Sequence, residues 1–107
     1  MTDKRIVLST AGSEDEARKI ALHLVDHYLA ACVNIVPRVE SIYRWQGKVE
    51  SSAEWLLLIK TSTEKFAAVR EAIQELHSYE LPECVSITID DGSVPYLKWL
   101  SDSLKSS

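Results

Sequence analysis

Residues 31–45 read ACVNIVPRVESIYRW, residues 48–61 read KVESSAEWLLLIKT, and only Gln46-Gly47 separates the two segments. Both segments are rich in β-branched and aromatic side chains, which are the types enriched in β-strands. A two-residue connection that ends in glycine is typical of the tight turn of a β-hairpin. The sequence therefore predicts one long antiparallel hairpin in the middle of the chain.

The predicted hairpin is longer than the body that should carry it. Strands usually have about 5–6 residues, but a strand over residues 31–45 would extend for about 50 Å at about 3.3 Å per residue. A compact chain of this size has a radius of gyration of about 13 Å, which makes it roughly 34 Å across. The tip, with Ile42, Tyr43, Trp45 and Val49, should overhang its own subunit. Apolar edges left in water pair with other chains, so we expect an obligate oligomer.

The composition narrows the class of protein. The 107 residues fit one domain, 1–107. A net charge of −4 disfavours nucleic acid as a partner, because phosphate binding needs a basic patch. No segment approaches the ~20 apolar residues of a membrane span, and Ile6-Val7-Leu8 is too short for a signal-peptide core. We therefore expect no membrane association and a cytoplasmic location. Cys32 and Cys84 lack C-x-x-C spacing and are expected to be buried, reduced thiols.

The segments before the hairpin predict a strand and a helix. Residues 5–10 form a short apolar run that is typical of a buried strand. Ser13 and Glu16 have the S-x-x-E spacing of a capping box, which predicts a helix beginning there. Within the hairpin itself, Pro37 is expected to kink or bulge the first strand, because proline cannot donate to a ladder of hydrogen bonds.

The segments after the hairpin complete the order of elements. Residues 61–64 offer a second helix cap, for a helix that ends near His77. Residues 84–89 alternate as a fourth strand, and Pro95 suits the first turn of a last helix. The order βαββαβ predicts an α+β, ferredoxin-like sandwich with a long central β-hairpin and an extra C-terminal helix.

This topology carries many unrelated activities, so the function must be argued from particular residues. A metallochaperone of this type has C-x-x-C in its first loop, but residues 9–13 contain no cysteine. The same loop lacks the arginine of an acylphosphatase, and the acidic charge disfavours an RNA-recognition module. No serine or cysteine lies beside a recognisable base. We therefore expect no enzyme.

Two groups of residues could bind a ligand. His23 and His27 are four residues apart, so they share one helical face and could grip a divalent cation, or they could be two solvated surface side chains. Residues 77–83, HSYELPE, hold an imidazole, a phenol and two carboxylates between the second helix and the last strand. Loops at element ends often carry binding groups. This segment is either a ligand or ion site or a turn whose polar groups cap the helix.

Several segments together resemble the CutA divalent-cation tolerance family. The motifs run in order from residue 6 to residue 104: AACVNIVP (30–37), SIYRWQGK (41–48), LIKT (58–61), HSYELPE (77–83) and YLKWL (96–100). The resemblance implies a homotrimer of ferredoxin-like subunits that is similar to PII signalling proteins, with the long hairpins pairing between subunits. It also implies a link to copper and other divalent cations, and no catalysis.

The resemblance also directs attention to particular residues. Some family members carry cysteine where this chain has Ser9 and a histidine pair where it has Leu76-His77, and those groups are proposed copper ligands. Only His77 remains here as a metal ligand, and one imidazole cannot hold copper tightly without other donors. The polar groups expected to line a cleft between subunits are Tyr43, Lys60, Tyr79 and Glu83.

Three functions follow from this sequence. The first is a trimer that senses or buffers an ion, possible copper included, or a small molecule in clefts between subunits. The second is a structural trimer that binds a protein partner or small molecule and no metal. The third is an enzyme that uses His77, Tyr79 and Glu83 as acid–base groups, which would need all three within hydrogen-bond reach of a substrate.

Overall fold

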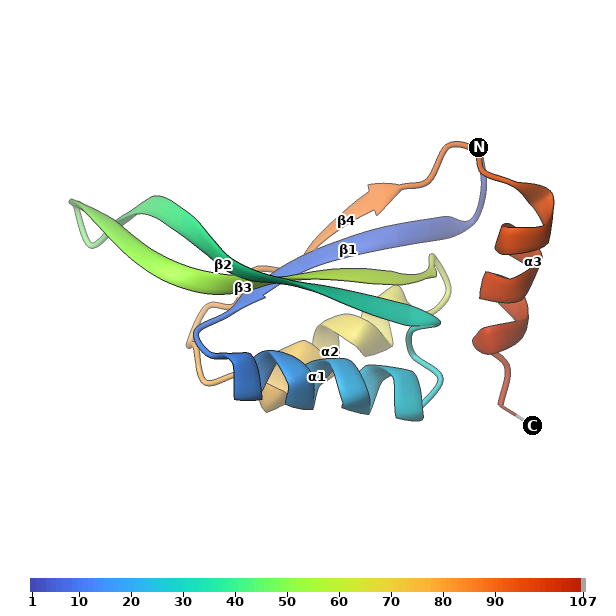
Figure 1. The fold of residues 1–107 in the computed structure, drawn as a ribbon, viewed down its shortest axis with the longest axis horizontal. Helices are drawn as coiled ribbons and strands as arrows, with labels where there is room; N and C mark the ends of the chain where they lie inside the picture. Colours follow the sequence, from blue (N-terminus) through green and yellow to red (C-terminus); the bar gives the residue numbers. More distant parts are fainter. Residues whose placement is uncertain (107) are drawn as a thin grey trace.

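The computed structural model describes residues 1–106 and confirms the ferredoxin-like fold (Figure 1). Its elements follow in the order β1 (Lys4–Ala11), α1 (Glu14–Asp26), β2 (Cys32–Trp45), β3 (Lys48–Ser62), α2 (Phe66–Leu76), β4 (Val85–Thr88) and α3 (Val94–Ser103). The four strands form one antiparallel sheet with the order β2-β3-β1-β4. No helix in residues 1–106 has the length and apolar character needed to cross a membrane.

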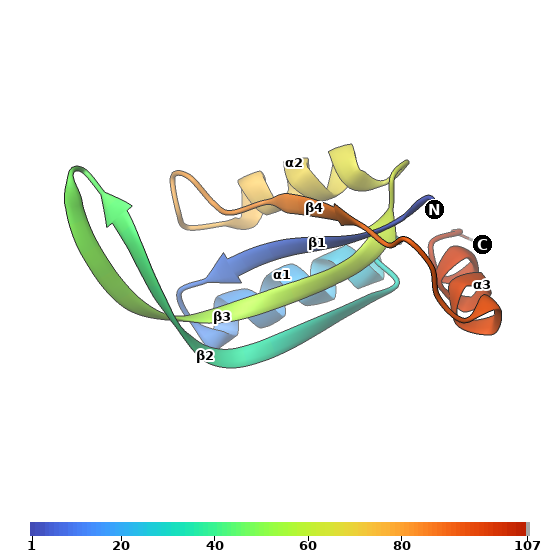
Figure 2. The same ribbon diagram turned by 90° about the horizontal axis from the view of Figure 1, so that it is seen from above.

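Helices α1 and α2 lie side by side on one face of the sheet (Figures 1 and 2). The core between the two layers consists of the inward residues of α1, α2, β1 and β3, among them Val7, Ile20, Leu24, Leu57 and Ile73. Ser13 caps α1 as predicted, because its side chain accepts a hydrogen bond from the Glu16 amide at 3.1 Å. The periodic apolar stripe of α1 thus faces the sheet and leaves its polar side in solvent.

The opposite face of the sheet carries an apolar patch that no helix of the subunit covers. Ile6 pairs with Ile87, and Leu8 pairs with Val85, so these four side chains point to the face that carries no helix. Val85 and Ile87 are 50% and 46% exposed. An antiparallel sheet with one solvated face usually has polar residues there, so this face resembles an interface that lacks its partner.

The central hairpin is confirmed and extends beyond the rest of the subunit (Figure 1). Gln46 and Gly47 have φ angles of 50° and 79°, which are the left-handed values that a type I′ hairpin turn requires. β1 pairs with β3 only as far as Trp55, so the part of β3 nearer the turn pairs with β2 alone. The molecule is 44 Å long and 26 Å and 23 Å in the other two directions.

A bulge bends β2 where proline was expected to disturb it. The register with β3 shifts between Val36 and Val39, and the intervening Arg38 has a φ of 53°. Pro37 cannot donate to the ladder, so the extra residues leave the pairing at this point. The bend separates a proximal half of the hairpin, which belongs to the main sheet, from a distal half that projects away from it.

Two predicted boundaries are wrong. Residues 61–64 do not cap α2, because Thr61 and Ser62 still pair with β1 and the Thr61 hydroxyl donates to the Leu29 carbonyl at 2.6 Å. Helix α2 begins later, at Phe66, after an N-cap residue whose side chain makes no capping bond. β4 is shorter than the predicted strand, because only Val85–Thr88 pair with β1.

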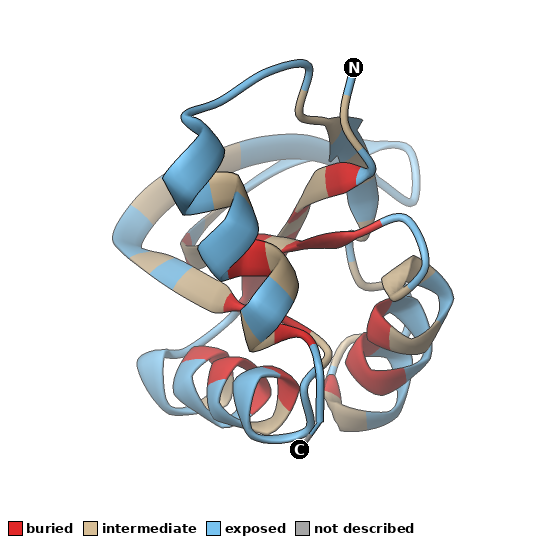
Figure 3. Cartoon of the chain, turned by 90° about the vertical axis from the view of Figure 1, so that its right-hand side faces the viewer, coloured by how far each residue is buried: buried red, intermediate tan, exposed pale blue. Residues whose placement is uncertain are grey.

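Helix α3 packs against one end of the sheet and near the start of β2. Its Leu100 and the C-cap residue Leu104 form a small apolar cluster with Ala31, and Figure 3 shows the buried side of the helix against its largely exposed outer surface. Pro95 lies in the first turn, as predicted. Tyr96 and Trp99 of the same helix contact each other with ring centroids 5.4 Å apart and remain partly exposed.

Candidate functional site

His77 is the centre of a polar cluster at the end of β1. Its side chain is fully buried. Nε2 lies 2.6 Å from the Thr10 carbonyl oxygen, and Nδ1 accepts the Tyr79 backbone N–H at 3.1 Å. A carbonyl can only accept and an amide can only donate, so the proton is on Nε2 and the lone pair is on Nδ1. These two bonds describe a neutral imidazole.

The carboxylate of Glu16 adds an acid to the cluster. Its Oε1 lies 3.2 Å from His77 Nδ1 and accepts a hydrogen bond from the Ser78 hydroxyl at 3.1 Å. Beside the neutral imidazole this carboxylate makes no ion pair, but it would make one if His77 were protonated. The cap by Ser13 fixes the first turn of α1 and so places Glu16 against the end of α2.

Tyr79 joins the cluster to the base of the projecting hairpin. Its hydroxyl donates to Glu54 Oε2 at 2.8 Å. Glu54 is only 7% exposed, which is unusual for a charged residue. Burial, and then the hydrogen bond to Glu54, raise the pKa of Tyr79 above its ordinary value, with a smaller contribution from Tyr43. A side chain on Gly12 would lie 3.0 Å from the Tyr79 hydroxyl, so the absence of one leaves room for the phenol.

The structure brings some of the predicted site residues together and separates others. His77 and Tyr79 are in contact, with ring centroids 4.5 Å apart, and Tyr43 is near enough to influence Tyr79. Lys60 lies near the other end of β3, where its ammonium is 3.4 Å from the Tyr96 hydroxyl. Glu83 is exposed and precedes Cys84. Burial raises the pKa of that thiol, and Glu83 adds to the rise while Arg70 opposes it.

Four members of the cluster were not predicted from the sequence: Thr10, Gly12, Glu16 and Glu54. Thr10 contributes its backbone carbonyl, and every residue has one, so the residue type could not identify it. Glu54 could have been noticed, because it is a lone carboxylate between Ala53 and Trp55 where the strand turns from polar to apolar. Such a residue is buried only when it has a partner.

A copper ion does not fit His77 as the cluster stands. A metal ligand needs a free ring lone pair, and the lone pair on Nδ1 already accepts the Tyr79 amide. Within residues 1–106 no three His, Cys, Asp or Glu side chains gather in a way that could hold a metal ion. The carboxylate of Glu16 is the one acidic group against this imidazole in the described chain, and Ser9 and Leu76 supply no donor of the cysteine or imidazole type.

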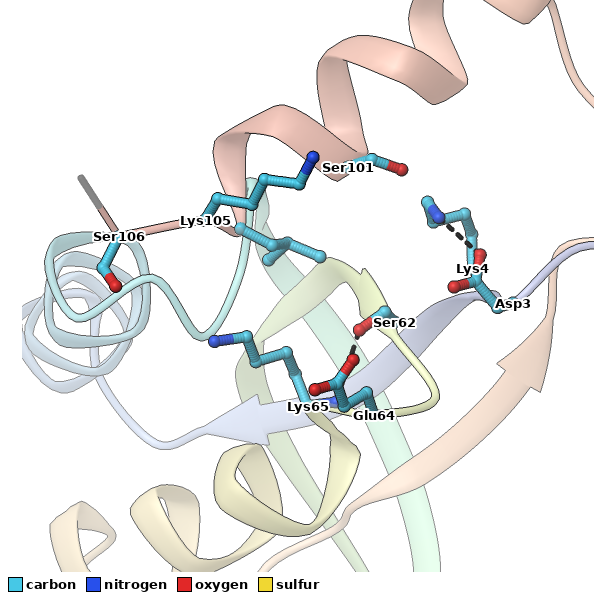
Figure 4. Close-up of a pocket in the computed structure, with 9 residues that line it drawn as sticks. Asp3, Lys4, Ser62, Glu64, Lys65, Ser101, Lys105 and Ser106 are labelled. Carbon is cyan, nitrogen blue, oxygen red and sulfur yellow. Dashed lines mark hydrogen bonds and ion pairs between the residues drawn. The ribbon is translucent and has the colours of Figure 1, made fainter.

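Two cavities lie away from this cluster. The larger, of about 540 Å³, is between the start of β1, the β3–α2 connection and the end of α3 (Figure 4). Figure 4 shows Lys65 and Lys105 along its border and Lys4 paired with Asp3. The smaller cavity, of about 350 Å³, lies at the hairpin bulge and includes Ser52, whose hydroxyl is 3.3 Å from that of Tyr43.

The fold and these motifs match one protein family throughout. Residues 5–103 match the family model described as CutA1 divalent ion tolerance protein. The chain is 49% identical over 100 residues to the divalent-cation tolerance protein CutA of Thermus thermophilus, covering 94% of this chain and 97% of that protein. It is 45% identical over 93 residues to the Xenopus laevis CutA homolog, where the match covers 87% of this chain and 62% of the relative.

Solved structures agree with this assignment. The divalent cation tolerance protein Cut A1 of T. thermophilus superimposes with a TM-score of 0.89 at 50% identity, covering 91% of this chain and 94% of that one. CutA of Xylella fastidiosa gives a TM-score of 0.95 at 36% identity, covering 97% and 100%. The chain therefore belongs to the CutA1 divalent ion tolerance family.

Proposed function

We propose that this protein works as a homotrimer in the cellular response to divalent metal ions, with a PII-like binding or signalling role in clefts between its subunits. The observation that carries the proposal is apolar surface left exposed in two places, on the open face of the sheet and at the tip of the distal hairpin. Ile42 and Val49, near the turn, are 68% and 67% exposed in the subunit. A stable chain rarely leaves so much apolar surface in water, so partner subunits are needed to cover it.

A three-fold arrangement is what the family resemblance implies, and the bend at the bulge supports it. The bend directs the distal hairpin away from its own sheet, so that its unpaired length is available to a neighbouring subunit (Figure 2). An assembly of this kind would cover the tip and the open sheet face at once. The cytoplasm is the location that we propose for the trimer.

The ligand of such a cleft would contact the residues around Tyr79. Tyr43 and Tyr79 supply phenol groups, and the buried His77 and the carboxylate of Glu16 lie beside Tyr79. We include Glu83, and Lys60 from a neighbouring subunit, as further polar groups of the cleft. Copper held by His77 is not part of the proposal, because both ring nitrogens are already hydrogen-bonded.

Native mass spectrometry on tag-free protein tests this function. We expect a species of about 36 kDa, three times the 12.1 kDa chain, that persists on dilution to nanomolar concentration. Candidate ions and small-molecule metabolites would then be added to the trimer, and binding compared between the wild type and Tyr79→Phe. A monomer at micromolar concentration would contradict the proposal, and so would a trimer in which Tyr43 and Tyr79 lie far from every subunit boundary.

A second candidate is an assembly trimer that binds a protein partner and no metal. Its support is the aromatic pair on α3, because Tyr96 and Trp99 are exposed and contact each other with tilted rings. Aromatic side chains of this kind are common anchors in protein interfaces. Pull-downs that recover one partner with the wild type and lose it with Trp99→Ala, in cells whose metal tolerance does not change on deletion of the gene, would favour this function.

A further inference from the structure

Two histidines stack on the outer side of α1, remote from the cluster around His77. His23 is in the last turn of the helix and His27 is its C-cap residue. Their rings are nearly parallel, with centroids 4.1 Å apart and an angle of 23° between the planes. The His27 side chain is 56% exposed. Helix α1 lies on the face of the sheet opposite the open apolar face (Figure 1).

The backbone fixes which nitrogen of His27 is free. Its Nδ1 lies 2.9 Å from the His23 carbonyl oxygen, which also accepts the His27 backbone N–H at 3.0 Å. Because a carbonyl only accepts, Nδ1 carries the proton and Nε2 carries the lone pair. Histidines that bind metals usually donate their other N–H to a backbone carbonyl or carboxylate in this way, which fixes the tautomer and the ring orientation.

The spacing of the rings suits one metal ion. Imidazole nitrogens bind at about 2.0–2.1 Å, so two of them in neighbouring coordination positions lie about 3 Å apart. Rings with centroids 4.1 Å apart reach that spacing when the His23 side chain turns its Nε2 toward that of His27, while His27 keeps its bond to the backbone. The C-terminal end of a helix carries partial negative charge, which favours a cation there.

We propose that the half-buried His23 and the exposed His27 form a two-imidazole site for a divalent transition-metal ion, with Cu(II) bound most tightly among the common ions. Imidazole suits copper, nickel and zinc, and the order of divalent affinities places Cu(II) first. Water completes the coordination, so the site binds and releases its ion readily. This site is on α1, whereas His77 follows α2. Both of its ligands come from one subunit, so the site does not depend on trimer formation.

Isothermal titration of tag-free protein with Cu(II), at about pH 7.5 where imidazoles are generally neutral, measures the affinity. We expect a binding event of one ion per chain, weakened at least tenfold in both His23→Ala and His27→Ala. Electron paramagnetic resonance of the Cu(II) complex should show coupling to two nitrogen nuclei, and to one in either variant. Lys19→Ala, an exposed change one turn earlier on α1, is the matched control and should bind as the wild type does.

A restored pair makes the test independent of the fold. In the His27→Ala background, Lys19→His places two imidazoles four residues apart again, at positions 19 and 23, and should recover most of the lost affinity. The proposal is overturned if His23→Ala and His27→Ala both bind Cu(II) like the wild type. It is equally overturned if the restored pair recovers none of the lost affinity. Binding that survives the combined His23→Ala and His27→Ala variant but disappears with His77→Gln would also overturn it. Native mass spectrometry of the same samples reports assembly separately.

Discussion

The Tyr79 hydroxyl donates to Glu54 Oε2 across 2.8 Å, and this bond joins the loop after α2 to the point where β3 leaves the main sheet. Glu54 is buried, and within residues 1–106 this phenol is the hydrogen-bond partner of its carboxylate. The bond therefore fixes the hairpin base relative to the cluster around His77. Any movement of the distal hairpin on binding would be felt at Tyr79.

Removal of this hydroxyl should destabilise the subunit. Tyr79→Phe leaves the buried Glu54 carboxylate without its donor, and hydrogen bonds to charged groups contribute about 1.5–3 kcal/mol. We expect a loss of about 2 kcal/mol in the free energy of unfolding, measured by urea denaturation. Adding Glu54→Gln to Tyr79→Phe should recover part of the loss. A Tyr79→Phe protein as stable as the wild type would show that water replaces the phenol.

The same residue should make stability fall at alkaline pH. The pKa of Tyr79 is raised in the folded protein from an ordinary value of 10.0, so the folded state holds this proton more tightly than the unfolded state does. Its contribution is fully present below about pH 10 and is lost as the pH rises from there through the folded-state pKa. Urea unfolding between pH 9 and 11 should show a steeper decline in the wild type than in Tyr79→Phe, and parallel declines would contradict the assignment.

A substitution at Ser9 should stabilise the folded subunit. Its side chain is fully buried on β1, and within the described chain its hydroxyl has no hydrogen-bond partner. Replacing an unsatisfied buried polar group with an apolar one of similar shape removes a desolvation cost of about 1–3 kcal/mol. We expect Ser9→Ala to raise the free energy of unfolding by about 1 kcal/mol. A decrease would reveal a partner for the hydroxyl, such as a buried water.

A substitution at Gln46 in the hairpin turn should also raise the stability of the subunit. Gln46 has a φ of 50° in the type I′ turn, where asparagine is preferred because its short side chain accommodates left-handed backbone. Gln46→Asn should raise the melting temperature slightly, by an amount equivalent to about 0.5 kcal/mol. Gln46→Val is the matched opposite, since a β-branched residue is strained at this φ and should lower it. Equal melting temperatures for the two variants would mean that turn strain does not limit stability.

Trp45 should matter more to assembly than to the subunit. It lies beside the turn and is 43% exposed, so a substitution removes little from the subunit core. If partners bury it, Trp45→Ala should cost about 3–5 kcal/mol of association free energy and produce smaller species on dilution. Leu22→Ala, on the outer side of α1, is the control that should leave the mass unchanged. A Trp45→Ala trimer that survives nanomolar dilution would exclude the tip from the interface.

Much of the fold could be predicted because local chemistry and tertiary structure agree. The S-x-x-E cap, the Gln46-Gly47 turn and the bulge at Pro37 each depend on a few neighbouring residues. The expected cap at residues 61–64 failed because Thr61 and Ser62 are held by long-range pairing with β1. Ser and Thr favour helix caps only where a sheet does not already use their backbone groups.

The site was harder to predict than the fold because it is assembled across the chain. His77 and Tyr79 came from one segment and do lie together, but their partners are the Thr10 carbonyl and the carboxylates of Glu16 and Glu54. Lys60 and Tyr79 were grouped by motif, and the register of β3 separates them within a subunit. Motifs identify residues, but only strand register determines which of them meet.

The position of β1 in the sheet imposes an order on synthesis of the chain. β1 leaves the ribosome before both of the strands that pair with it. It lies between β3 and β4, so its pairing cannot begin until Trp55 of β3 has been made and is complete only at Ser62. Loop closure over such a distance is slow, so the apolar stretch around Ile6 and Leu8 must wait while α1 and the hairpin emerge. During that interval the nascent chain presents a strand without partners, which is a natural substrate for a ribosome-associated chaperone.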